Sequence, residues 1–223
     1  MTRGQVTATL SNRVLKLAVE KLTVGKGTVN SGATLDASGT GAKLDYQATM
    51  ADMQAEPLLK TFADTDRLSG TIAFETNGKG SGGNQKELIE SLNGSGQFKI
   101  LDGAINGINL AATLRQAGSL GMQSSQAQKT DFAELSGTYT IKDGVVENHD
   151  MKMLAPLVRL TGSGTVPLPP QTVDYAVEAK LVATTAGQGG EDALAGLPIP
   201  IKITGSWSDP NYQIGRASCW ERV

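Results

Sequence analysis

The chain has 223 residues, of which 27 are glycine and only 4% are aromatic, a composition that favours strands and turns over long helices. Its 20 basic and 22 acidic residues give a net charge of −2, which leaves no basic surplus for binding nucleic acid, so we exclude nucleic acid as a partner. No apolar run approaches the roughly 18 residues of a membrane-spanning helix, and the length suits one β domain or two small ones.

Apolar residues alternate with polar ones along much of the chain. This period of two predicts about nine or ten strands of an antiparallel sheet with one apolar face and one solvated face. The clearest run is Val173, Tyr175, Val177, Ala179 and Leu181. In chain order, the other segments are Leu15/Leu17/Val19, Leu44/Tyr46/Ala48/Met50, Ile72/Phe74, Phe98/Ile100, Tyr139/Ile141, Met151/Met153, Val158/Leu160 and Ile199/Ile201/Ile203.

Two similar stretches, 41 residues apart, each contain an Asp-Gly pair, Asp102-Gly103 and Asp143-Gly144. Aspartate bonds to nearby backbone N–H groups and glycine tolerates a positive φ, so both pairs are predicted to be turns between strands.

Three short helices are predicted at residues 56–62, 85–92 and 109–116, the last with Asn109 as a candidate N-cap. Loops are predicted at residues 77–84, 118–129 and 184–192, where Gly, Ser, Asn and Gln accumulate.

The last ten residues, Ile214 to Val223, resemble the translation of a sequencing adapter and contain Cys219, the single cysteine. We therefore expect one domain over residues 1–213 and a tail over 214–223 that does not belong to the fold.

The chain carries no convincing set of catalytic or metal-binding residues. His149 is the single histidine, so multi-histidine metal sites are excluded, and the loss of Cys219 excludes thiol chemistry and zinc ribbons. The Gly-Lys runs near Lys26 and Lys79 lack the order of a phosphate-binding loop. We expect no catalytic residue, no metal and no cofactor.

The apolar face itself is the remaining candidate site. It is either the dry core of a β sandwich or the lining of an open groove for acyl chains, and periodicity does not separate the two. A transmembrane barrel is disfavoured, because its aromatic girdles need more than 4 Phe, 4 Tyr and 2 Trp. The candidate groove residues are Leu44, Tyr46, Ile72, Phe74, Phe98, Ile100, Tyr139, Ile141, Leu160, Val173, Tyr175, Val177, Ile201 and Ile203.

Several stretches resemble the C-terminal domain of the AsmA family, in the order in which that family has them. The resemblance covers about residues 10–213. The stretches are residues 57–60 (PLLK), 66–70 (DRLSG), 92–115 (LNGSGQFKILDGAINGINLAATLR), 130–137 (TDFAELSG), 154–166 (LAPLVRLTGSGTV) and 197–212 (LPIPIKITGSWSDPNY).

This resemblance implies a mainly β fold, a curved antiparallel sheet or incomplete barrel with two or three short helices. It also implies a periplasmic, non-enzymatic protein of outer-membrane biogenesis, related to TamB- and YhdP-type envelope proteins that carry phospholipid along a β groove. In the full-length protein an N-terminal helix, absent from this sequence, would anchor it in the inner membrane. The alternative is a closed interaction domain that docks an envelope-assembly partner.

Overall fold

The computed structural model describes residues 3–63, 66–118, 128–182, 196–207 and 209–215. Within them the chain forms one antiparallel sheet of twelve strands and three short helices. The strands are β1 (Arg3–Ser11), β2 (Val14–Val24), β3 (Gly27–Asp36), β4 (Ala42–Gln54), β5 (Leu68–Gly82), β6 (Asn93–Asn106), β7 (Lys129–Lys142), β8 (Val145–Leu154), β9 (Val158–Pro167), β10 (Thr172–Leu181), β11 (Pro198–Ser206) and β12 (Asp209–Ile214). The helices are α1 (Ala55–Ala63), α2 (Gln85–Glu90) and α3 (Leu110–Gly118).

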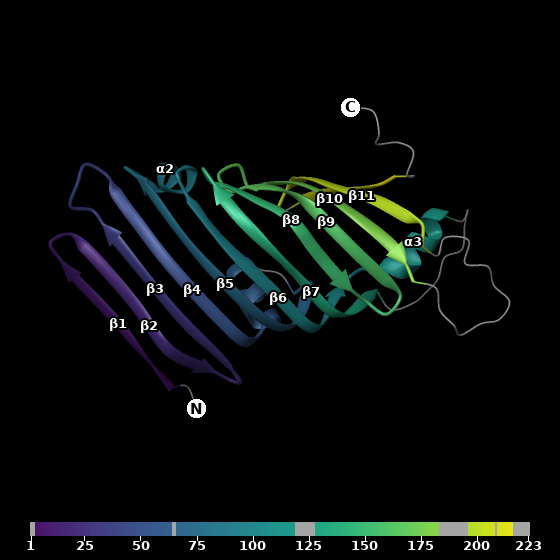
Figure 1. The fold of residues 1–223 in the computed structure, drawn as a ribbon, viewed down its shortest axis with the longest axis horizontal. Coiled ribbons are helices and arrows are strands. Elements are labelled where there is room, and N and C mark those ends of the chain that lie inside the picture. Colours follow the sequence, from purple (N-terminus) through teal and green to yellow (C-terminus); the bar gives the residue numbers. More distant parts are fainter. Residues whose placement is uncertain (1–2, 64–65, 119–127, 183–195, 208, 216–223) are drawn as a thin grey trace.

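The sheet is a simple meander, in which every strand pairs with the next one along the chain. Figure 1 shows the strands side by side from β1 at one end to the C-terminal strands at the other. Strands β1 and β12 form the two edges and do not pair with each other, so the sheet is not closed into a barrel. The predicted fold class is confirmed, and all nine alternating segments lie within strands.

The register of the sheet gives it one continuous apolar row. Directly paired residues lie on the same face of a sheet. The row crosses eight strands, β4 to β11, through Met53, Ile72, Ile100, Leu135, Met153, Leu160, Ala179 and Ile199. The opposite face carries cross-strand ion pairs such as Lys79–Asp45 (3.1 Å) and Lys99–Glu134 (3.0 Å). The sheet therefore has one apolar and one charged face.

Several strands contain β-bulges, each of which bends its strand. The register shifts between Val19 and Leu22 in β2, between Met50 and Met53 in β4, and between Ser69 and Thr71 in β5. Lys21, Asp52 and Asp102 lie in or beside these shifts with φ of 48°, 55° and 48°.

The two Asp-Gly pairs differ. Asp143-Gly144 forms the predicted turn between β7 and β8, with φ of 47° and 73°. The turn predicted at Asp102-Gly103 is wrong, because both residues lie inside β6, opposite Gly70 of β5, at a bulge. There the positive φ belongs to the aspartate, and Gly103 is needed because a Cβ would collide with the Ser69 carbonyl oxygen and the Phe132 ring.

The predicted loop at residues 77–84 is also wrong over most of its length, because β5 continues to Gly82. Gly78 pairs with Tyr46 on one side and Gly94 on the other, so a glycine-rich segment is held in the sheet by both neighbours. The loops predicted at 118–129 and 184–192 fall mainly or wholly outside the described residues.

The three predicted helices are present. Helix α2 ends at Glu90, two residues early, because the Leu92 N–H donates to the Ile89 carbonyl oxygen in a tighter turn at 3.1 Å and β6 begins at Asn93. Helix α3 begins after Asn109, whose Oδ1 accepts from the Ala112 N–H at 3.0 Å, as expected of an N-cap. The tail expected to lie outside the fold begins at Ile214, but β12 includes Ile214, and the Gly215 N–H donates to the Pro200 carbonyl oxygen at 3.0 Å. Residues 216–223 of that tail lie outside the described residues.

Candidate functional site

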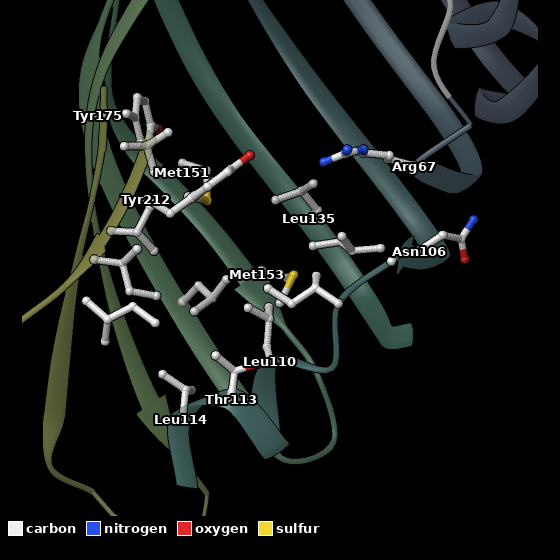
Figure 2. A pocket seen from close by; sticks show the side chains of 18 of the residues that line it. Arg67, Asn106, Leu110, Thr113, Leu114, Leu135, Met151, Met153, Tyr175 and Tyr212 are labelled. Atoms are coloured by element: carbon white, nitrogen blue, oxygen red, sulfur yellow. The ribbon is translucent and has the colours of Figure 1, made fainter. Parts of the chain in front are cut away.

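A cavity of about 700 Å³ lies on the apolar face, between β6–β12 and helix α3 (Figure 2). Six of the fourteen predicted groove residues line it: Phe98, Leu160, Tyr175, Val177, Ile201 and Ile203. Further apolar lining comes from Ile105, Ile108, Leu110, Leu114, Leu135, Met151, Met153 and Ile214. Its volume falls within the range of about 300–1,000 Å³ that small-molecule sites occupy.

The other eight predicted residues share the same face but do not line the cavity. Ile72 and Ile100 pack in the core beside it, and Ile100 is only 3% exposed. Ile141 is also buried. The remaining five lie along β4, β5, β7 and β10: Leu44, Tyr46, Phe74, Tyr139 and Val173.

Four of the predicted aromatic residues lie directly opposite a glycine of the neighbouring strand. The pairs are Tyr46–Gly78, Tyr139–Gly96, Phe98–Gly137 and Tyr175–Gly164. A Cβ on Gly78 would approach the Tyr46 hydroxyl oxygen to 2.7 Å, and one on Gly137 would approach the Phe98 ring to 3.1 Å. The rings therefore cover the glycine backbone.

A polar network holds the Tyr175 side chain at the cavity wall. The Tyr175 hydroxyl donates to Asn148 Oδ1, while Asn148 Nδ2 donates to the Thr138 carbonyl oxygen at 2.6 Å and to Asp150 Oδ1 at 2.9 Å. Hydrogen bonds to the Asp150 carboxylate lower its pKa, and the bond from the Thr138 N–H has the largest effect. Burial, with a smaller effect of the Asp150 charge, raises the pKa of Tyr175 to about 12. Tyr175 is thus held neutral and oriented.

Helix α3 closes one end of the cavity. Leu114 is 1% exposed and Leu110 and Ala111 are buried, so the apolar side of this helix rests on the sheet. The first turn is attached through Thr130 of β7, whose hydroxyl accepts from the Leu110 N–H at 2.9 Å and donates to the Ile108 carbonyl oxygen at 2.8 Å.

Polar residues from two chain segments form the mouth of the cavity, and none of them was predicted as a site residue. Asp66 and Arg67 precede β5, and Asn106 ends β6. The Asn106 N–H donates to the Arg67 carbonyl oxygen at 2.8 Å, and Asn106 Nδ2 donates to the Asp66 carbonyl oxygen at 2.9 Å. No periodic pattern marks these residues, because their proximity depends on the pairing of β5 with β6.

The apolar face continues beyond the cavity toward β1, where it is uncovered. Val6 is 66% exposed, Leu10 74% and Leu17 44%. Val6 and Leu10 pair with Val19 and Leu15, so the apolar pattern reaches the edge of the sheet. The cavity is thus one part of a longer apolar surface.

The described part of the chain offers no group of three or more His, Cys, Asp or Glu side chains able to hold a metal ion. Its helices are too short or too polar to cross a membrane.

Comparison with known proteins places these features in context. The AsmA family model matches residues 6–151. Protein AsmA of Escherichia coli (strain K12) is 25% identical over 197 residues, which cover 84% of this chain and 31% of that protein. The chain therefore spans about a third of the length of this curated relative. No solved structure matches the chain.

Proposed function

Because the chain belongs to the AsmA family, we propose that it is a non-enzymatic domain of a cell-envelope protein that holds or conducts phospholipid along its apolar face during outer-membrane biogenesis. The proposal includes a periplasmic location and an inner-membrane anchor in the full-length protein. The observation that carries it is the apolar cavity of about 700 Å³, which opens onto an apolar face that no second sheet covers among the described residues.

Energetics supports this use of the face. Each acyl methylene exposed to water costs about 0.8 kcal/mol, so a chain of about 16 carbons costs roughly 12 kcal/mol in an aqueous gap. Neighbouring strands are about 4.8 Å apart, so eight strands joined by the apolar row would offer about 40 Å of lining. A charged headgroup can stay in water at the rim.

Adjacent residues of β11 provide the test, because they point to opposite faces of one strand. Photo-crosslinking side chains at Ile201 and Ile203 should capture co-purified phospholipid, and one at Lys202 should not. Lipid is identified by mass spectrometry of the crosslinked protein.

A charge in the lining should separate a groove from a closed core. Ile203→Asp should leave the domain folded, as followed by circular dichroism, and should remove the bound lipid, because the charge stays partly solvated. The control Thr204→Asp, on the opposite face of β11, should leave both the fold and the bound lipid unchanged. Absence of lipid from the wild-type protein, together with unfolding by Ile203→Asp, would favour the closed interaction domain instead.

A further inference from the structure

The polar groups of the cavity are not spread evenly over its lining. The Thr113 hydroxyl donates to the Asn109 carbonyl oxygen at 2.9 Å, and the Tyr175 hydroxyl donates to Asn148 in the wall. At the mouth, Asn106 Nδ2 donates to the Asp66 carbonyl oxygen at 2.9 Å, and the side chains of Asp66 and Arg67 lie beside it. Tyr212 on β12 adds a phenol hydroxyl to the lining. Among the described residues that line the cavity, Arg67 is the one cation.

The close view shows how two of these side chains lie. In Figure 2 the Arg67 guanidinium and the Tyr212 hydroxyl point toward each other from opposite sides of the cavity, with Leu135 and Met151 near them. Tyr212 is 55% exposed, so its hydroxyl lies where the cavity meets water. The mouth thus presents hydrogen-bond donors above an apolar interior.

We infer that Arg67 and Tyr212 bind the phosphate of a lipid headgroup whose acyl chain fills the cavity. The guanidinium fork matches phosphate oxygens in a bidentate arrangement, and a phenol adds one further donor. Asp66 brings one negative charge to the same mouth, so a zwitterionic phosphate headgroup, with a cation near Asp66, fits better than one with only negative charge.

The position of the charged pair is fixed by the sheet. The two hydrogen bonds from Asn106 fasten the carbonyl groups of Asp66 and Arg67 to the end of β6. The backbone that carries the headgroup site is therefore bonded to the strand that lines the acyl cavity, and this inference rests on the proposed function.

Two lipids with the same acyl chains test the inference, a phosphatidylcholine and a diacylglycerol that lacks the phosphate. Arg67→Gln and Tyr212→Phe should each weaken phosphatidylcholine binding by about ten-fold or more, since a hydrogen bond to a charged group is lost, and leave diacylglycerol binding unchanged. Asp66→Asn should raise the affinity for phosphatidylglycerol relative to phosphatidylcholine. Lys79→Gln, on the opposite face, is the matched control for loss of a cation.

If Arg67→Gln weakens the binding of both lipids equally, or the binding of neither, the headgroup site is overturned. The proposed binding of acyl chains in the cavity would still stand. Binding of inorganic phosphate alone, dependent on Arg67, would also overturn it, since the site would then take the free ion. If the wild-type protein binds neither lipid, the proposed function itself fails, which is a separate result.

Discussion

At the scale of single residues, the apolar face repeats one kind of cross-strand pair, a glycine covered by the aromatic ring of the residue opposite. Gly78, Gly96, Gly137 and Gly164 each lie opposite a Tyr or Phe of a neighbouring strand. Glycine usually weakens a strand, because it has no side chain to pack. Here the partner ring fills that space, so both residues of each pair depend on each other.

Gly164→Ala should therefore destabilise the domain by about 1–3 kcal/mol, because overpacking forces the backbone to shift. Its Cβ would lie 2.6 Å from Tyr175 Cα, which is backbone and cannot rotate away. The control is Gly32→Ala on β3, where the nearest atom is the Gln47 side-chain nitrogen at 3.7 Å. Urea denaturation measures both, and equal losses would refute the packing argument.

Tyr175 should make the domain sensitive to alkaline pH. Its pKa rises from 10.0 to about 12 in the folded state, so between these values the unfolded chain loses the proton first. The contribution of the neutral Tyr175 side chain to the free energy of unfolding is fully present below pH 10 and is lost as the pH rises toward 12. Tyr175→Phe should show a shallower loss of stability over this window, measured by denaturation at several pH values. A slope identical to that of the wild type would contradict the assignment.

At the scale of secondary structure, helix α3 determines where the apolar face becomes a cavity. Leu114→Ala should destabilise by about 2–5 kcal/mol, because it removes a fully buried side chain and leaves a void. Leu101→Ala is the control, since Leu101 is 40% exposed and should cost far less. Thermal unfolding of both variants measures the difference, and similar costs would show that α3 is not anchored by Leu114.

The strands and helices were largely predictable from sequence, because alternation and capping are local. Two errors share one cause. Residues 77–82 and Asp102-Gly103 have the composition of loops and turns, yet strand pairing holds them in β5 and β6. In both cases a ring contributed by another strand, Tyr46 or Phe132, occupies the space beside the glycine. Such contacts are non-local, so no window of sequence contains them.

The candidate site was predictable only in part, for the same reason. Alternation identified the lining residues Phe98, Tyr175 and Ile201, because each belongs to a strand with a regular pattern. It did not separate them from Ile141 or Tyr139, which share their face but lie outside the cavity. Arg67 has no periodic neighbour and reaches the cavity through the pairing of β5 with β6.

At the scale of the whole molecule, the two ends of the sheet differ in how well the apolar face is covered. The C-terminal strands carry α3 and the buried core, whereas Val6 and Leu10 on β1 are mostly exposed. An exposed apolar edge strand is prone to pair with other chains.

Val6→Lys with Leu10→Lys should therefore reduce self-association of the purified domain while changing its stability by less than about 1 kcal/mol. Light scattering over a range of concentrations measures the association. Replacing Ala179 and Ile199, which are buried in the core and do not line the cavity, by lysine should instead unfold the domain. Unchanged self-association of the β1 variant would show that this edge strand does not mediate contacts between copies of the domain.

The meander has a consequence for how the domain can vary in length. Each strand pairs with its immediate neighbours in sequence, so a hairpin gained or lost at the β1 edge alters no other pairing. Each added hairpin would lengthen the apolar surface by roughly 10 Å, twice the strand spacing. The number of strands therefore sets the length of the apolar surface, and insertion or duplication of hairpins changes that length while the pairing of the other strands is kept.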